Sequence, residues 1–167
     1  ANTFLKSKKI NIGKSIYEKK QIKNAIDIQR LAKNRGCEII LPVDVIVSNK
    51  NKSIDIKDIK NNYKIFDVGV KTINVITNKI NCSNTVIWSG PLGFFEKKPF
   101  DNATNKISNL INSKKRIISI AGGGDTIAAI KKNKKFKNFT FLSTGGTAFL
   151  SWLEKYTLPG IEVLKKN

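Results

Sequence analysis

The 167-residue sequence contains no histidine and no methionine, and it has only two cysteines. Without histidine, imidazole acid–base chemistry and histidine-based metal sites are excluded. Cys37 and Cys82 lie far apart without metal-ligand spacing, which predicts reduced structural thiols in a cytosolic protein rather than a disulfide. The absence of methionine indicates either a piece of a longer protein or removal of an initiator methionine in front of Ala1.

Long apolar runs are also lacking. No stretch approaches the roughly 18 residues of a membrane span, and the first residues lack the charged-then-apolar profile of a secretory signal. Hydrophobic residues make up 40% of the sequence and recur in Ile/Val/Phe runs, which is typical of a folded globule. We therefore expect a cytoplasmic, monomeric protein without membrane association, forming a single domain over residues 1–167.

The formal net charge of +19 raises the possibility of nucleic-acid binding. The only arginines are Arg30, Arg35 and Arg116, although base readout and bidentate phosphate contacts favour arginine. The lysines are scattered instead of forming one stripe, and the enrichment of Asn, Ile and Lys together fits an AT-rich coding bias. A basic, non-enzymatic nucleic-acid-binding module that reuses the fold is therefore the alternative function, and it is disfavoured.

Helical periodicity dominates residues 16–35. Ser15 with Glu18 fits a capping box at its start, and Gly36 fits a C′ glycine at its end. Gly13-Lys14-Ser15 resembles the end of a phosphate-binding Walker loop, but the glycine required five residues earlier is absent. The pattern therefore predicts a helix start at Ser15.

Residues 37–47 form a nearly continuous apolar run, which predicts a strand kinked or ended near Pro42. Asp44, in its second half, would be costly if it were buried without a partner. Leu158-Pro-Gly-Ile161 predicts an extended exit. The other predicted elements are strands over 65–69, 85–88, 116–121 and 139–142, and helices over 71–81, 103–113, 125–132 and 148–155.

Glycine-rich loops follow three of these strands, at residues 89–93, 122–125 and 144–147. Alternating strands and helices predict a doubly wound, Rossmann-like α/β fold, with a parallel sheet in a three-layer α/β/α arrangement. The carboxyl ends of parallel strands share one edge, so the three loops should converge there. A helix that begins at Asp125 would direct its free N–H groups and dipole towards a phosphate. The sequence thus predicts a nucleotide or phosphate site.

Five motifs occur in one order along the chain: Leu41-Pro-Val-Asp44, Trp88-Ser-Gly-Pro-Leu-Gly-Phe-Phe-Glu96, Gly122-Gly-Gly-Asp-Thr126, Ser143-Thr-Gly-Gly146 and Leu158-Pro-Gly160. Together they closely resemble the C-terminal, nucleotide-binding domain of the phosphoglycerate kinase family, over essentially the whole chain. The resemblance implies phosphoryl transfer between 1,3-bisphosphoglycerate and ADP, giving 3-phosphoglycerate and ATP in glycolysis with Mg²⁺. It also implies that the phosphoglycerate substrates bind a separate N-terminal domain.

The resemblance assigns roles to individual residues. It implies that the backbone amides of Gly123 and Gly124 face the transferring phosphoryl group. It also implies that Asp125 binds the Mg²⁺ of the nucleotide and that Glu96 accepts hydrogen bonds from the ribose. The implied nucleotide-binding set is Ser89, Gly90, Glu96, Gly122, Gly123, Gly124, Asp125, Thr126, Gly145 and Gly146. Taken alone, Asp125 could merely cap a helix, and Glu96 could be a solvated loop carboxylate.

Four positions depart from the family pattern. The family usually has Asn at Ser89, glycine at Thr147 and at Ile65, and a small polar residue at Phe149. A β-branched Thr147 is unfavourable if the position needs a positive φ. The family's first nucleotide-binding strand and two phosphate-facing lysines have no counterpart in this sequence. We therefore expect an incomplete domain that binds Mg-ADP weakly and has no turnover alone.

Overall fold

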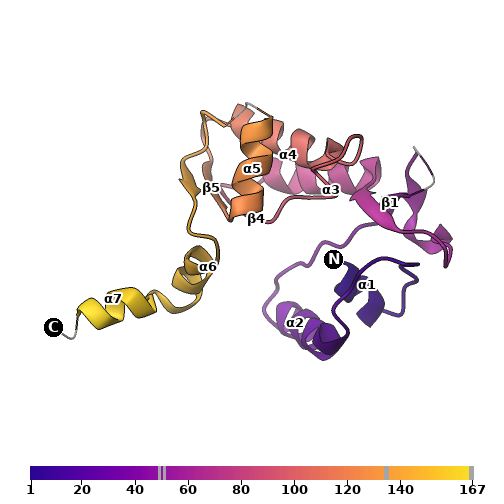
Figure 1. Cartoon of the computed structure of the whole chain (residues 1–167), viewed down its shortest axis with the longest axis horizontal. Helices are drawn as coiled ribbons and strands as arrows, with labels where there is room; N and C mark the ends of the chain where they lie inside the picture. Colours follow the sequence, from indigo (N-terminus) through magenta and orange to yellow (C-terminus); the bar gives the residue numbers. More distant parts are fainter. Residues whose placement is uncertain (49, 51, 134–135, 166–167) are drawn as a thin grey trace. The chain divides into compact units, whose positions relative to one another are not determined.

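The structure, a computed structural model, describes residues 1–48, 50, 52–133 and 136–165. The chain divides into two compact units, each built from two stretches of sequence. Figure 1 labels helices and strands along the chain. The first unit comprises Ala1–Asn78 and Leu92–Ala103, and the second comprises Lys79–Pro91 and Thr104–Asn167. The predicted α/β class is confirmed, because the second unit contains a parallel sheet with helices.

The first unit contains an antiparallel sheet that the sequence did not predict. Its central strand β1 (Asp44–Val47) pairs with β2 (Ile54–Asp55) and β3 (Ile65–Val68). Val45 and Val47 are fully buried in the core of this unit. The strand predicted over residues 37–47 is therefore confirmed only for its last four residues, which follow Pro42.

Helices α1 (Asn2–Ser7) and α2 (Ile22–Asn34) complete the first unit, together with most of α3 (Val70–Asn81). Helix α2 ends as predicted. Gly36 has a φ of +63°, and the amide of the next residue, Cys37, donates to the carbonyl of Ala32 at 2.8 Å. This bond from C″ to C3 is the Schellman arrangement, which selects glycine at the C′ position.

The predicted helix start at Ser15 is wrong, because α2 begins seven residues later, at Ile22. The Ser15 hydroxyl accepts a hydrogen bond from the amide of Ile65 at 2.8 Å, so it does not cap a helix. The amide of Lys14 donates to the carbonyl of Tyr63 at 2.6 Å. A Cβ on Gly13 would overlap backbone atoms of Tyr63. The Gly13–Ser15 segment is thus fixed against the chain that enters β3.

Asp44 is only 2% exposed, but it has several hydrogen-bond partners. Its carboxylate accepts bonds from the amides of Lys71 and Thr72, at 3.0 and 2.8 Å, and from the Thr72 hydroxyl at 2.7 Å. Burial raises the pKa of Asp44, but these bonds outweigh burial and hold the pKa below its ordinary value. Asp44 therefore satisfies first-turn amides of α3 from a neighbouring strand.

Asp67, at 3% exposure, is the second buried carboxyl group of the first unit. Its oxygens accept hydrogen bonds from the amides of Val68 at 2.8 Å and Ala103 at 3.1 Å. Burial raises the pKa of Asp67 to about 6, against the effect of those bonds, and the charge of Asp101 acts in the same direction as burial. The Asp67 carboxyl group of the folded chain therefore keeps its proton above pH 4 and loses it near pH 6.

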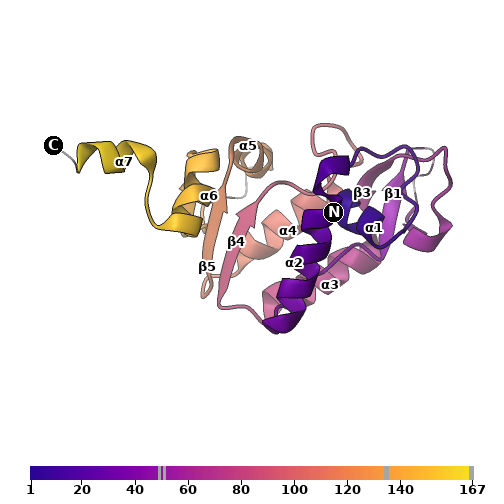
Figure 2. The same ribbon diagram turned by 90° about the horizontal axis from the view of Figure 1, so that it is seen from below.

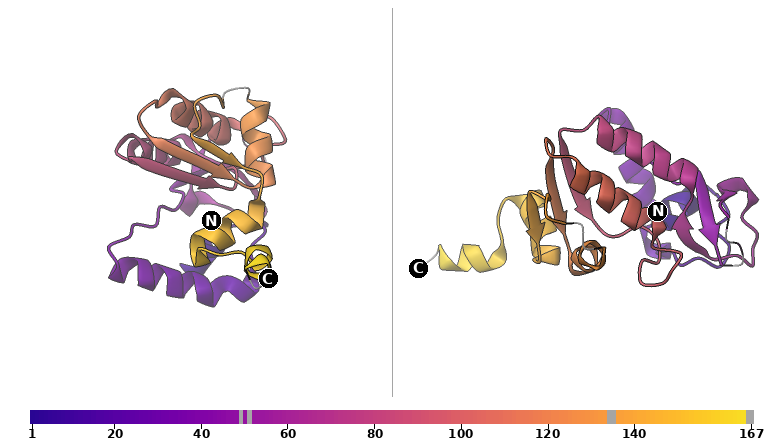
Figure 3. Two further views of the ribbon diagram at one scale, coloured as in Figure 1. Left: turned by 90° about the vertical axis from the view of Figure 1, so that its left-hand side faces the viewer. Right: turned by 90° about the horizontal axis from the view of Figure 1, so that it is seen from above.

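The second unit contains a parallel sheet in the order β4-β5-β6. These strands span Thr85–Ser89, Ile118–Gly122 and Phe141–Ser143, close to their predicted positions. Helices α4 (Asn102–Ser113) and α5 (Gly124–Lys132) connect them, also as predicted. The connection from β4 to β5 and the connection from β5 to β6 each lead to the next strand in the same direction across the sheet. Because such connections are right-handed, both helices lie on one side of the sheet (Figure 3).

Two helices end the chain, α6 (Gly146–Lys155) and α7 (Pro159–Leu164). Helix α6 confirms the predicted helix over residues 148–155. The predicted extended exit at Leu158–Ile161 is wrong, because Pro159 occupies the first turn of α7. Proline has no amide to lose at that position and a φ that suits a helix, so Leu158-Pro-Gly begins a helix here.

Candidate functional site

The carboxyl ends of β4, β5 and β6 lie side by side. In the register of the sheet, Ser89 is opposite Gly122, and Gly122 is opposite Ser143. Each strand runs directly into one of the three glycine-rich loops. The predicted convergence of these loops on one sheet edge is therefore confirmed, within the second unit.

The central loop starts α5. Gly123 precedes the helix with φ +101° and ψ 140°, a conformation that only glycine adopts readily. The first amide bonded inside the helix is that of Ile127, which donates to the carbonyl of Gly123 at 3.0 Å. Helix geometry leaves the amides of Gly124, Asp125 and Thr126 without an acceptor in their own helix. They form a short row of donors beside two exposed residues, Gly124 and Asp125.

Thr126 connects the first and second loops. Its side chain is buried, and its hydroxyl accepts a hydrogen bond from the amide of Gly90 at 2.7 Å. The carbonyl of Gly90 accepts a bond from the Trp88 indole, also at 2.7 Å. Gly90 has a φ of +98°, so glycine is favoured there as well. The loop after β4 is thereby held against the start of α5.

The third loop is anchored by Ser143. Its carbonyl accepts a bond from the amide of Gly123, and its hydroxyl accepts one from the amide of Gly145, both at 3.3 Å. Gly146 opens α6 with a φ of +44°. Thr147 follows inside the helix. Lys9 and Tyr156 are the non-glycine residues with positive φ in the described chain. Thr147 therefore does not have the positive φ that would strain a β-branched residue.

One glycine in each of the three loops faces open space. Cβ atoms placed on Gly90, Gly124 and Gly146 would meet no heavy atom of the described residues within 4 Å. Packing therefore does not require glycine at Gly124, where φ is not positive either. Small residues around a row of amide donors leave room for a bulky anion to approach the backbone.

Phe149 contributes a contact that the sequence did not predict. A Cβ on Gly122 would lie 2.7 Å from Cε1 of the Phe149 ring and closer still to Cδ1. The ring of Phe149, on the first turns of α6, therefore covers Gly122 at the end of β5. The missing side chain of Gly122 makes room for this ring, and no local sequence signal links the two residues.

Asp125 is exposed in the first turn of α5. Within the described ranges, no group of three or more His, Cys, Asp or Glu side chains is close enough to hold a metal ion. Mg²⁺ is commonly bound by one or two carboxylates together with substrate phosphates and water. A single carboxylate beside free amides fits Mg²⁺ only when a phosphate ligand supplies the remaining oxygens.

Glu96 and Ile65 belong to the first unit, whereas β4, β5 and β6 belong to the second. Glu96 is exposed in the turn that follows Phe94, whose amide donates to the carbonyl of Phe66 at 2.7 Å. Ile65 begins β3. The role implied for Glu96 at a ribose stays a prediction.

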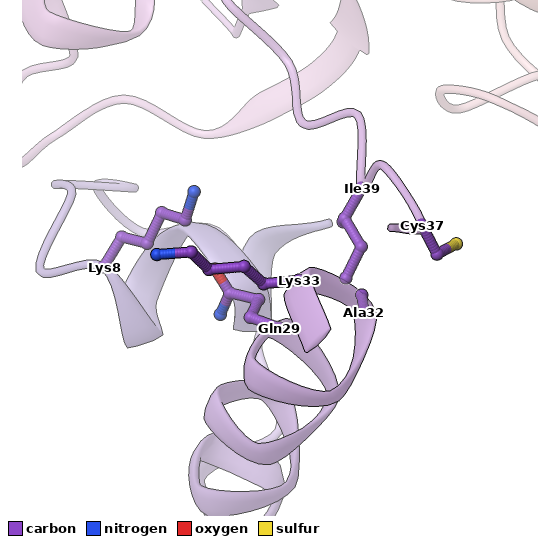
Figure 4. Close-up of a pocket in the computed structure, with 6 residues that line it drawn as sticks. All are labelled: Lys8, Gln29, Ala32, Lys33, Cys37 and Ile39. Atoms are coloured by element: carbon purple, nitrogen blue, oxygen red, sulfur yellow. The ribbon is translucent and has the colours of Figure 1, made fainter. Parts of the chain in front are cut away.

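A cavity of about 260 Å³ lies in the first unit, and none of the residues that line it is a predicted site residue. Lys8, Lys33 and Gln29 extend along one side of it, and apolar atoms of Ala32 and Ile39 lie on the other (Figure 4). The Gln29 amide donates to the Ser7 hydroxyl and to the Ala25 carbonyl, both at 2.9 Å. No motif in the sequence indicated this cavity.

A family model described as phosphoglycerate kinase matches residues 1–155. This chain belongs to the phosphoglycerate kinase family. A phosphoglycerate kinase of Orientia tsutsugamushi (strain Ikeda) is 44% identical over 100% of this chain. A phosphoglycerate kinase of Xanthobacter flavus is 39% identical over 99% of the chain.

Solved structures of the same family share the fold. A phosphoglycerate kinase from Coxiella burnetii matches 99% of this chain with a TM-score of 0.90 and 34% identity, over 43% of its own length. One from Pyrococcus horikoshii OT3 matches 98% with a TM-score of 0.82 and 28% identity, over 42% of its length. The chain likewise spans only 44% of the two curated relatives. These comparisons give no support to the nucleic-acid alternative.

The structure adds two smaller observations. None of the helices in the described part of the chain is long and apolar enough to cross a membrane. Cys37 and Cys82 are both free and exposed.

Proposed function

We propose that this chain is the nucleotide-binding half of a phosphoglycerate kinase, an incomplete C-terminal domain over residues 1–167 that binds Mg-ADP or Mg-ATP. One observation carries the proposal, the alignment of three glycine loops at one sheet edge, around the amides of Gly124, Asp125 and Thr126 that have no acceptor in their own helix. Membership of the kinase family supports it. The proposed setting is glycolysis in the cytoplasm.

The phosphates of the nucleotide would contact the start of α5. The amides of Gly123 and Gly124 are the proposed donors to the transferring phosphoryl group, and Thr126 holds the neighbouring loop in position. The Gly123 amide donates to the Ser143 carbonyl at 3.3 Å, so it would have to exchange this acceptor for the phosphate. Backbone donors at a helix start stabilise negative charge without a protonated side chain. Ser89 and Gly90 border this place on one side, and Gly145 and Gly146 border it on the other.

Mg²⁺ would bind Asp125 together with the nucleotide phosphates and would neutralise charge during transfer. Glu96 is proposed to accept hydrogen bonds from the ribose. The acyl-phosphate substrate, 1,3-bisphosphoglycerate, and its product, 3-phosphoglycerate, would bind the part of the kinase that this chain does not span. The 167 residues alone should therefore bind nucleotide weakly, as a monomer, and show no turnover.

Calorimetric titration with Mg-ADP tests this proposal. We expect saturable heat with a dissociation constant in the range of tens of micromolar to millimolar, which corresponds to roughly −4 to −6 kcal/mol. The variant Asp125→Asn should weaken Mg-ADP binding about tenfold or more and change ADP binding without Mg²⁺ much less. Absence of heat at millimolar Mg-ADP, in a sample with a folded circular dichroism spectrum, would refute nucleotide binding.

A further inference from the structure

Residues 92–101 form a loop of the first unit, within the connection from β4 to α4 (Figure 2). We call it the Glu96 loop, after the residue proposed to accept hydrogen bonds from the ribose. Glu96 and its neighbours Lys97 and Lys98 are exposed, and the loop, which the structure describes throughout, contains no helix or strand. Loops are more mobile than the elements they join, so other contacts must fix the position of Glu96.

Asp67 of β3 contacts both ends of the Glu96 loop. At the start of the loop, a Cβ on Gly93 would lie 2.6 Å from Cγ of Asp67 and closer still to Oδ1. Gly93 also has a φ of +65°, so the close approach and the backbone conformation both favour glycine. Just beyond the end of the loop, Oδ2 of Asp67 accepts a hydrogen bond from the amide of Ala103 at 3.1 Å. One carboxyl group therefore lies against both ends of the loop.

Phe66, also on β3, holds the middle of the loop. Its carbonyl accepts a hydrogen bond from the amide of Phe94 at 2.7 Å. Its ring stacks with the ring of Phe94 at 5.9 Å between centroids, and it lies 4.7 Å from the ring of Phe100. The amide of Phe100 donates to the carbonyl of Lys97 at 2.9 Å, which closes the turn between the two aromatic residues. The loop is therefore held to β3 along its length as well as at its ends.

The carboxyl group of Asp67 lies where ionisation is unfavourable. Its side chain is buried, and burial raises its pKa to about 6. Asp101, at the end of the Glu96 loop, is also buried, and its charge raises the pKa of Asp67 further. At neutral pH Asp67 is therefore charged at a cost in stability. Buried groups with perturbed pKa values cluster at functional sites, which favours a role for Asp67 beyond packing.

We infer that Asp67 is a positioning residue for nucleotide binding, because it holds the Glu96 loop so that the Glu96 carboxylate accepts hydrogen bonds from the ribose hydroxyls. The inference rests on the proposed function. Asp67 acts through Glu96 and does not touch the nucleotide itself. Its removal should therefore weaken the binding of ribonucleotides and leave the binding of nucleotides without ribose hydroxyls unchanged.

Calorimetric titration of the 167-residue chain with Mg-ADP and with Mg-2′,3′-dideoxy-ADP tests the inference. The original chain should prefer Mg-ADP by about tenfold or more, because the dideoxy sugar offers Glu96 no hydroxyl donor. In Asp67→Ala this preference should fall to about twofold or less, with Mg-dideoxy-ADP binding within about twofold of the original. The double variant Asp67→Ala/Glu96→Ala should bind Mg-ADP as Glu96→Ala alone does, because the two residues act as one unit.

Gly93→Ala approaches the same contact from the loop and decides the test if Asp67→Ala fails to fold. Its methyl group would overlap the Asp67 carboxyl group and displace the loop, so the preference for Mg-ADP should again be lost. Gly36→Ala is the matched control. Gly36 has a similar φ of +63°, but a Cβ there would meet no heavy atom of the described residues within 4 Å. This variant should keep the full preference.

The inference is overturned if Asp67→Ala or a folded Gly93→Ala keeps the preference, or if the binding of both nucleotides falls equally. It is also overturned if the original chain binds the two nucleotides equally. All three results leave the proposed function in place, because Mg-ADP still binds the original chain. Binding of neither nucleotide by the folded original chain would instead refute the proposed function, and the inference with it.

Discussion

Raising the pH from about 4 to 7 is expected to destabilise the first unit through one buried carboxyl group, Asp67. Burial raises its pKa to about 6, from an ordinary value of 3.8. The folded chain therefore keeps a proton that the unfolded chain releases between pH 4 and 6. The contribution of Asp67 to stability is complete below pH 4 and is lost as the pH rises through 6.

The size of the effect follows from the two pKa values. The difference between about 6 and 3.8, at 1.36 kcal/mol per pKa unit, gives a loss of up to about 3 kcal/mol. Solvent screening reduces this figure, so we expect about 2 kcal/mol. Asp44 affects the free energy of unfolding in a different pH range. Its pKa is lowered, so its contribution is present above pH 3.8 and is lost only below that value.

Urea unfolding followed by circular dichroism at several pH values between 4 and 7 measures this loss. The variant Asp67→Asn should flatten the dependence on pH, and the amide resonances of Val68 and Ala103 should titrate near pH 6 in the original chain. Asp27→Asn, at a half-exposed position of α2, is the control and should keep the original dependence. An equally steep loss of stability in Asp67→Asn would refute the reasoning.

Two further changes have definite expected outcomes. Gly122→Ala should destabilise the second unit by about 1–3 kcal/mol, because its methyl group overlaps the Phe149 ring. In a Phe149→Ala background the same change should cost much less, and an unchanged cost in thermal unfolding would exclude the overlap as its cause. Asp44→Ala should cost about 2 kcal/mol or more in urea unfolding, because the amide of Thr72 loses its buried acceptor; a cost under about 0.5 kcal/mol would contradict this role.

The second unit was largely predictable from the sequence. Short β-branched runs followed by glycine loops located β4, β5 and β6, and the parallel arrangement then placed their loops on one edge. Those signals are local in the sequence. The contact between Phe149 and Gly122 is not local, because it depends on how α6 returns over the strand ends.

The first unit was less predictable for the same physical reason. The pairing of β1 with β2 and β3 joins residues that no local pattern connects. Ser15 satisfied the sequence rule for a helix cap, but its hydroxyl binds the amide of Ile65, fifty residues away. At Leu158-Pro-Gly160, the same proline that can end a helix instead begins α7.

The central claim is that the amides at the start of α5 bind the phosphates of a nucleotide. Amide NMR of the 167-residue chain during titration with Mg-ADP tests it most directly, because each glycine loop has its own resonances. We predict saturable shifts at Gly124 and Asp125, with smaller shifts at Gly90 and Gly146, and little change at Gly36, which lies in the first unit. Shifts absent from all three loops, or no larger there than at Gly36, would contradict the claim.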